Sequence, residues 1–441
     1  MGKEVRVKLI NPPQPNSLDD RLDPPLGLMY IAAVLEKNDI SVEIIDLPFV
    51  ARQNWSERID HADFYGIIVY SASLYLAKEI AKIAKQNNPE CKVIIGGPHP
   101  TALPYETLLD EENFDIVVEK EGEETLLEIA EDWPLNKIDG IFYKKDGKII
   151  RNNPRAFIKN LDELPLPARH LVNILGYTRK VYGGKATSLI TSRGCPYNCA
   201  FCCKDVFGSK VRFKSIERVV LEIKQVIDQY GIDRFLFYDD TFVLYRKRLY
   251  PLCEKLAKLN IVFRCNGNAR YNTLEDYKML YKAGCRELAF GIESGSQKIL
   301  DLINKGVTVD QNVRAIRDAK KAGLIVKAYL MIGNPGESKE TVEETKRFIA
   351  DTDPDQFTLF TFVPLPGCDI WKHPQKYGIR IIDNDFKQYF NIAGNNEGGV
   401  VIETDRLKPE DIVELRNDLL SLLKSRGQRG SLQDYYQRIK E

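Results

Sequence analysis

The sequence has little histidine, no excess of either charge and no apolar segment long enough to span a membrane. Four histidines occur in 441 residues, and 63 lysines and arginines are balanced by 63 aspartates and glutamates. A neutral chain has no long-range attraction for polyanions, so the composition argues against nucleic acid as a partner. The charge-free apolar stretch from Tyr65 to Ala77 is shorter than the roughly 18 to 20 residues of a membrane span. No apolar signal core is found at the N-terminus, and we expect a cytoplasmic protein.

Cysteine is informative through its spacing rather than its number. Nine cysteines in a chain of this length do not suggest a disulfide scaffold. Three of them, Cys195, Cys199 and Cys202, have the spacing CxxxCxxC, with Cys203 adjacent. Thiolates at this spacing can bind one face of an iron–sulfur cube and leave its fourth iron open to another molecule. Structural zinc or buried thiols are the alternatives, although the histidines are not spaced as a zinc site requires.

Residues 1–140 alternate short apolar runs with amphipathic helical patterns. This alternation predicts an α/β fold in which a doubly wound parallel sheet has helices on both faces. Ligands of such sheets bind beyond the carboxyl ends of the strands, so the loops within 11–27, 71–74, 96–101 and 121–125 are the candidate binding loops. Residues 141–184 begin with a polar, hairpin-like stretch and continue with a proline-rich segment, which together predict a linker.

Strand and helix patterns return in residues 185–375 and repeat six times. Such repeats predict a partial (β/α)6 barrel whose chemistry lies at the carboxyl ends of its strands. Residues 376–441 are predicted to form a small, mostly helical C-terminal region, with one helix from Pro409 to about Arg426.

The cysteine motif and the segments after the later strands resemble the radical S-adenosylmethionine (radical SAM) superfamily. The aromatic Phe201 precedes the last cysteine, residues 291–294 resemble the GxES segment of that superfamily, and residues 364–367 resemble its PxPG segment. The resemblance covers about Thr187 to Trp371. It implies a 4Fe-4S cluster on the three cysteines and SAM-binding roles for Phe201, Asp239, Asp240, Arg270, Glu293, Ser294, Gly333 and Pro335.

The implied SAM-binding roles have simpler alternatives at several positions. Asp239 or Asp240 could accept hydrogen bonds from the SAM ammonium, or either could begin a helix. Arg270 is suited to hold a carboxylate, or it could form a surface ion pair. Glu293 lies at an apolar strand end, where a charged side chain requires a partner. The segment from Gly333 to Glu337 is explained equally well by a glycine-proline turn.

The N-terminal domain resembles that of the cobalamin (B12)-binding radical SAM family, whose members include the class B methylases. The resemblance lies in Pro24–Leu35, Ser71–Ser73, Gly96–His99 and Glu121–Glu123. Glycines let the backbone approach a flat ligand closely, and the serines offer small donors. The cobalamin-binding residues implied are Pro12, Leu26, Gly27, Ser71, Ser73, Leu74, Gly96, Gly97, His99, Gly122 and Glu123. The DxHxxG motif that supplies a lower axial histidine is missing, so base-off cobalamin is expected, and His99 could reach the corrin or only bond within its loop.

The resemblance implies an enzyme that cleaves SAM at the cluster to a 5'-deoxyadenosyl radical and methylates an unactivated carbon through methylcobalamin. No catalytic residue beyond the cluster and cofactors is identified. The implied partners are a small-molecule, lipid or natural-product substrate and a low-potential electron donor such as flavodoxin or ferredoxin. The alternatives are a radical SAM cyclase or rearrangement enzyme, an enzyme that does not use cobalamin, and a non-catalytic cobalamin or SAM sensor.

Overall fold

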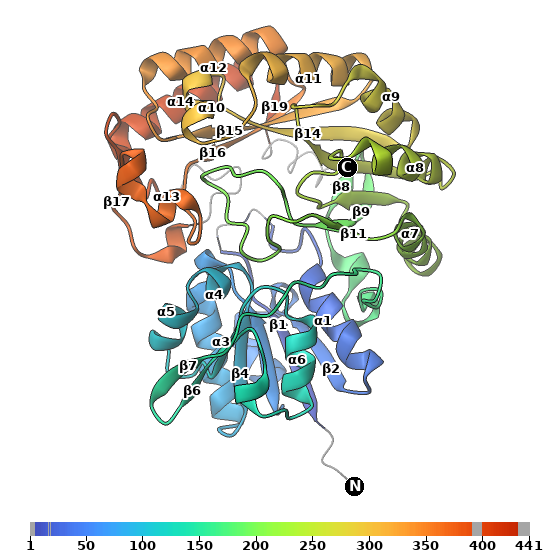
Figure 1. Ribbon diagram of the computed structural model, residues 1–441, viewed down its shortest axis with the longest axis vertical. Coiled ribbons are helices and arrows are strands. Elements are labelled where there is room, and N and C mark those ends of the chain that lie inside the picture. The colour runs from blue at the N-terminus through green and yellow to red at the C-terminus, as the bar shows by residue number, and fades with distance from the viewer. Residues whose placement is uncertain (1–4, 16, 18, 390–398, 431–441) are drawn as a thin grey trace. The chain divides into compact units, whose positions relative to one another are not determined.

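The computed structural model describes residues 5–15, 17, 19–389 and 399–430. These residues form two compact α/β units, which are drawn in Figure 1. The first unit holds residues 5–15, 19–177 and 203–212, and the second holds residues 17, 178–202, 213–389 and 399–430. The first unit is therefore not continuous in sequence.

The first unit is built on a seven-stranded sheet in the order β2-β1-β3-β4-β5-β6-β7. Its strands are β1 (Arg6–Asn11), β2 (Ser41–Asp46), β3 (Phe64–Ile68), β4 (Lys92–Gly96), β5 (Ile116–Val118), β6 (Ile141–Lys145) and β7 (Lys148–Arg151). The first five are parallel, which confirms the predicted sheet. The last two form an antiparallel hairpin on its edge, so the sheet continues into the segment predicted to be a linker.

Helices cover both faces of this sheet because the strand order reverses between β1 and β3. The helices are α1 (Leu26–Lys37), α2 (Trp55–Arg58), α3 (Leu74–Asn87), α4 (Pro98–Ala102), α5 (Pro104–Leu109) and α6 (Glu123–Ala130). The connections from β1 to β2 and from β3 to β4 run in opposite directions, so right-handed crossovers place α1 and α3 on opposite faces. Helix α6 packs against α1. Open sheets of this kind bind ligands where the order reverses.

The second unit is built on an eight-stranded sheet in the order β19-β16-β15-β14-β13-β12-β9-β8. Its strands are β8 (Lys180–Val181), β9 (Gly184–Leu189), β12 (Arg234–Phe237), β13 (Val262–Gly267), β14 (Cys285–Glu293), β15 (Ile325–Ile332), β16 (Gln356–Thr361) and β19 (Arg429–Gly430). The six strands from β9 to β16 are parallel, which confirms the predicted partial barrel. Two short strands, β10 (Ser192–Arg193) and β11 (Arg212–Phe213), lie outside it.

The helices of the second unit line the outside of this curved sheet (Figure 1). They are α7 (Ile216–Tyr230), α8 (Arg246–Ala257), α9 (Leu274–Lys282), α10 (Gln297–Leu302), α11 (Val309–Lys321) and α12 (Lys339–Thr352). Phenylalanine side chains fill the layer between helices and sheet, and Phe237 contacts both Phe242 and Phe263. The apolar faces of these helices and strands are therefore buried in one core.

The C-terminal part continues the second unit and mixes helix with strand. Helix α14 (Pro409–Ser425) confirms the predicted helix and packs against α12 and β16. Helix α13 (Asp369–Lys372) precedes it, and β17 (Ile379–Ile381) pairs with β18 (Ile402–Thr404) in a small antiparallel sheet. Residues 390–398 and 431–441, which belong to the region predicted to be mostly helical, lie outside the described residues.

The turn after β15 is closed by a buried carboxyl group. Gly333 and Gly336 have φ angles of +85° and +69°, which a side chain would strain. Glu337 is 1% exposed and accepts hydrogen bonds from the backbone N–H groups of Gly333 and Asn334. Burial raises the pKa of Glu337 to about 7, although these hydrogen bonds favour the charged form.

We predict that Gly284→Ala destabilises the second unit far more than Gly231→Ala. Both glycines have positive φ, so each alanine costs about 1 to 2 kcal/mol of backbone strain. A Cβ at Gly284 would also lie 2.0 Å from the Ile261 carbonyl oxygen, whereas one at Gly231 would meet no atom within 4 Å. Strain and steric clash together should lower the free energy of unfolding of Gly284→Ala by roughly 3 to 5 kcal/mol. Urea unfolding of both variants measures the difference, and equal losses would contradict the close approach.

We also predict that Glu337 makes the stability pH-dependent. In the folded protein the pKa of the Glu337 carboxyl group is about 7, well above the ordinary value of a glutamic acid. The carboxyl group therefore keeps its proton at a pH where it is ionised in the unfolded chain. The stabilisation is therefore complete below about pH 4 and is lost as the pH rises towards 7. Relative to Glu337→Gln, the free energy of unfolding of the unmodified chain should fall between pH 5 and 8 by on the order of 3 kcal/mol. If the difference in free energy of unfolding between the unmodified chain and Glu337→Gln does not change with pH, the carboxyl group is already ionised at pH 5.

Candidate functional site

The three motif cysteines lie in the loop that follows β9 and β10. Cys195 and Cys199 are half-buried, Cys202 is exposed, and none of them is in a disulfide. The backbone of this loop is fixed on two sides: Ala200 donates to the Ile303 carbonyl at 2.8 Å, and its own carbonyl accepts from Ile370 N–H at 3.1 Å. The peptide groups of the loop thus help to fix its backbone.

Asp239 holds the chain that leads into this loop. It is 1% exposed at the end of β12. One carboxylate oxygen accepts from Thr191 N–H at 2.6 Å, and the other accepts from the hydroxyls of Thr191 and Ser192 at 2.5 and 2.6 Å. Its neighbour Asp240 is exposed. Of the two candidate aspartates, Asp239 therefore accepts hydrogen bonds from the residues before the cysteine loop, and Asp240 is exposed to solvent.

Glu293 has the partner that its buried position requires. Its carboxylate lies 2.7 Å from Nζ of Lys305, and Lys305 in turn lies over the ring of Phe201 at 5.4 Å. Burial lowers the pKa of Lys305, but Glu293 and the thiols of Cys199 and Cys202 outweigh that effect and leave the pKa above its ordinary value. The structure thus places an ammonium group close to two of the motif cysteines.

Arg270 connects the cysteine loop to the loop that carries Lys305. Its guanidinium stacks on the ring of Tyr197 at 4.5 Å and donates to the Lys305 carbonyl at 3.5 Å. A Cβ at Gly306 would lie 1.8 Å from the guanidinium, so only glycine allows this approach. Arg270 is therefore not a surface ion pair.

The other SAM-binding candidates lie further from the cysteine loop or inside the packing. Ser294 is fully buried and contacts the Thr345 hydroxyl of α12 at 3.2 Å. Gly333 and Pro335 are buried in the turn that Glu337 closes, and a Cβ at Gly333 would lie 3.3 Å from Ile412 of α14. These contacts bring none of the three to the cysteine loop.

Two residues of this site were not identified from the sequence. Lys305 follows Glu293 by twelve residues, because α10 intervenes before the chain returns. Tyr197 lies inside the cysteine motif itself. The sequence shows only an aromatic residue within the motif and a lysine before a glycine. Neither feature indicates which residue Tyr197 or Lys305 contacts.

In the first unit, the loops after β3 and β4 are joined to each other. Val69 N–H donates to the Gly96 carbonyl at 2.8 Å, and Nδ1 of His99 lies 3.0 Å from Oγ of Ser71. His99 is 3% exposed, and burial lowers its pKa to about 4. The neutral imidazole thus bonds within the loops, which was one of its two expected roles.

The remaining cobalamin-binding candidates all occur at the same edge of the sheet, with different exposure. The buried ones are Pro12, Leu26, Ser73, Leu74 and Glu123. Gly27 is exposed, and Gly96, Gly97 and Gly122 are half-buried. Gly97 has a φ of +105°, and a Cβ there would lie 3.1 Å from the Val69 carbonyl. Glycines therefore stand beside larger buried side chains at this edge of the sheet.

A buried ion pair that the sequence did not indicate fixes the loop before Gly122. Glu121 accepts from the Arg212 guanidinium at 2.7 Å and from Ile158 N–H at 2.9 Å. Arg212 stacks on Phe157 at 4.9 Å and donates to the Phe207 carbonyl. Residues 203–212 belong to the first unit for this reason.

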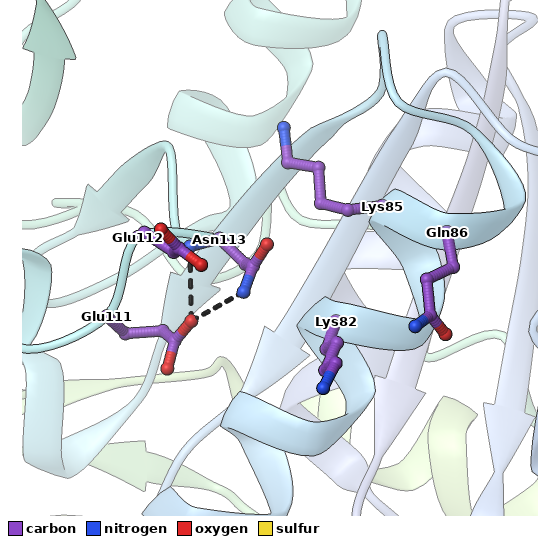
Figure 2. Close-up of a pocket in the computed structure, with 6 residues that line it drawn as sticks. All are labelled: Lys82, Lys85, Gln86, Glu111, Glu112 and Asn113. Carbon is purple, nitrogen blue, oxygen red and sulfur yellow. Dashed lines mark hydrogen bonds between the residues drawn. The ribbon is translucent and has the colours of Figure 1, made fainter.

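A separate pocket lies at the opposite, amino-terminal edge of the first sheet (Figure 2). It is lined by Lys82, Lys85, Gln86, Glu111, Glu112 and Asn113, and Glu111 accepts hydrogen bonds from Asn113. None of the predicted site residues lines it, so we assign it no role.

The cysteine trio suits a cluster better than a single metal ion. Within the described part of the chain, no three His, Cys, Asp or Glu side chains could hold one metal ion. Three cysteines of a cubane bind three different iron atoms and need not converge on one point. Nor does any helix of the described residues have the length and apolarity to cross a membrane.

Known sequences and structures agree with this arrangement. A model of the radical SAM superfamily matches residues 189–349, and a model of the B12 binding domain matches residues 23–130. The chain is 35% identical over 388 residues to an uncharacterized methyltransferase of Pyrococcus horikoshii, covering 84% of this chain and 83% of that one. It is 30% identical to the anaerobic magnesium-protoporphyrin IX monomethyl ester cyclase of Rubrivivax gelatinosus, covering 74% and 60%.

The fold is also that of a solved enzyme with both cofactors. The radical S-adenosylmethionine methyltransferase TsrM from Kitasatospora setae, with cobalamin and a [4Fe-4S] cluster bound, superposes with a TM-score of 0.74 at 18% identity. The match covers 96% of this chain and 89% of that one. With two matching domains and a relative that is 35% identical over most of both chains, this protein belongs to the cobalamin-binding radical SAM family.

Proposed function

We propose that this protein transfers a methyl group to an unactivated carbon of a small-molecule substrate. The observation that carries the proposal is the Glu293–Lys305 ion pair beside the cysteine loop. The amino-acid end of SAM carries one ammonium and one carboxylate, so Glu293 can accept from the first and Lys305 can donate to the second. An ion pair of matching charges is thus available where SAM must bind the open iron.

The residues of the chain bind and orient, and the cofactors supply the reactive groups. When bound, the cluster and SAM supply a 5'-deoxyadenosyl radical, and cobalamin supplies the methyl group. Cys195, Cys199 and Cys202 would hold the cluster, and Phe201 would cover Lys305 from solvent. Asp239 and Arg270 act as positioning residues, because each fixes the cysteine loop through a contact outside the motif.

The edge of the first sheet supports base-off cobalamin. Its loops carry glycines and small residues, and its histidine, His99, is buried against Ser71. We therefore assign His99 to holding two binding loops together, and Gly96, Gly97 and Gly122 to direct contact with the ligand. A low-potential flavodoxin or ferredoxin would supply electrons in the cytoplasm.

Anaerobic reconstitution tests the proposal as a whole. After loading with iron and sulfide, SAM and a reductant, the protein should form 5'-deoxyadenosine, and alanine at any of the three motif cysteines should abolish this product. Cys203→Ala is the matched control and should keep it, because Cys203 lies outside the motif. Retention of activity without the motif cysteines would contradict the cluster assignment, and a loaded but inactive protein would favour a sensor.

Addition of hydroxocobalamin to the reconstituted protein tests the methyl transfer itself. Stoichiometric base-off cob(II)alamin in the electron paramagnetic resonance spectrum is the expected result. A cluster without bound cobalamin would exclude methyl transfer by this route. It would leave a radical SAM enzyme of another kind, such as the cyclase to which the chain is also similar.

We predict that Lys305→Met lowers the affinity for SAM roughly 10- to 100-fold, since a charge-assisted hydrogen bond contributes about 1.5 to 3 kcal/mol. The double variant Glu293→Gln, Lys305→Met avoids a lone buried carboxylate and should show a similar loss. Lys298→Met, at an exposed lysine of α10, is the control. Equilibrium binding of SAM to the cluster-loaded protein measures the effect, and unchanged affinity in both Lys305 variants would refute the assignment.

A further inference from the structure

The strands of the partial barrel place one set of side chains against the helices and the other on the concave face. On β13, Phe263 contacts Phe237 and Phe242 in the layer between sheet and helices. On β14, Phe290 contacts Tyr277 of α9. Since strand residues alternate, Arg264 of β13 and the small residues Ala289 and Gly291 of β14 belong to the concave face.

Arg264 extends across β14 on this concave face. Its guanidinium donates to the hydroxyl of Tyr329 on β15, although β14 lies between the two strands. Ala289 and Gly291 are the β14 residues beneath this path, because they pair with Asn266 and Tyr329. A Cβ at Gly291 would lie 2.6 Å from the Glu293 carboxylate and 2.7 Å from Nζ of Lys305, so glycine keeps this part of the concave face open to those two groups. Gly291 thus makes room for charged groups inside the barrel.

The guanidinium of Arg264 is buried without a hydrogen bond or ion pair to an acidic side chain of the described residues. Arg264 is 7% exposed, its Nε has no hydrogen-bond acceptor, and it makes no ion pair with any residue that the structure describes. Burial lowers the pKa of Arg264, but Tyr329 and Glu287, the β14 residue that pairs with Arg264, outweigh burial, and Arg179 acts against them. A buried cation without a counter-ion is costly. The Nε–H group therefore remains a donor that an anion from outside the described chain can satisfy.

Tyr329 completes an oxyanion site. Its hydroxyl oxygen accepts from Arg264, so its own proton can be donated to the same anion. Its ring also contacts Phe360 of β16 at 5.9 Å, which gives the site an aromatic wall. Tyr329 pairs with Gly291, two residues before Glu293, or about 7 Å along the strand. An anion held here would lie near the proposed SAM end of the barrel.

We propose that Arg264 and Tyr329 bind an oxyanion of the methyl-accepting substrate, a carboxylate or a phosphonate next to a flat or apolar group. This inference rests on the proposed function, because it assumes that the concave face of the barrel holds the substrate. It narrows the substrate class to acids and disfavours a neutral lipid.

Phenylphosphonate and benzoate are suitable probes, with benzyl alcohol as the neutral control. Their binding to the cluster-loaded protein is measured by calorimetry. At least one anion should bind at one site per chain while benzyl alcohol does not, and comparison of the two distinguishes phosphonate from carboxylate. Arg264→Gln should weaken this binding at least tenfold, with Arg264→Lys and Tyr329→Phe intermediate. Arg286→Gln, on the same sheet but bonded at the outer face to Tyr281, should leave binding unchanged.

Three outcomes would overturn the proposal: neither anion binds, benzyl alcohol binds as well as the anions, or Arg264→Gln and Tyr329→Phe both bind like the unmodified protein. The Lys305→Met variant separates this site from the proposed SAM site. If that substitution and not Arg264→Gln weakens anion binding, the anion occupies the SAM site, and the proposal is wrong. The binding measurement requires no SAM cleavage, so failure of the radical chemistry would leave its result intact.

Discussion

The ion pair between Glu293 and Lys305 is the contact on which the reactive end of the barrel depends. It forms at the end of β14, where Glu293 adopts a φ of +63° that turns the chain out of the strand. Gly291 must be small, because a Cβ there would lie 2.6 Å from the Glu293 carboxylate and 2.7 Å from Nζ of Lys305. The ion pair therefore depends on the backbone conformation of Glu293 and on the absence of a side chain at Gly291.

The cysteine segment near this ion pair is fixed by contacts from several parts of the second unit. The cysteine segment must be rigid, yet its thiols must stay available for iron. Asp239 fixes the segment before the motif, Arg270 clamps Tyr197 inside it, and backbone hydrogen bonds at Ala200 hold its middle. Each of these three restraints acts on a carboxylate, a ring or a peptide group.

Local patterns were enough to predict both sheets, the cysteine loop and α14. Alternating apolar runs indicate which strands and helices are buried, and three cysteines at a fixed spacing indicate that they bind one ligand together. Lys305 and Arg212 could not be found in this way, because their partners Glu293 and Glu121 are distant in sequence and brought near only by folding. The sequence also did not indicate that Ser294, predicted to contact SAM, lies within hydrogen-bond distance of the Thr345 hydroxyl. The β6–β7 hairpin confirms the hairpin-like pattern of its residues, but its pairing with β5 could not be predicted from them.

The membership of residues 203–212 in the first unit means that neither half of the chain is a self-contained piece of sequence. A protein cut after Tyr177 would keep Glu121 but lose Arg212, and with it the cation that pairs with this buried carboxylate. The polypeptide that forms the cobalamin-binding fold is therefore finished only after the cysteine motif has been synthesised. On the ribosome, the first unit cannot reach its final packing until the cluster-binding loop has also emerged.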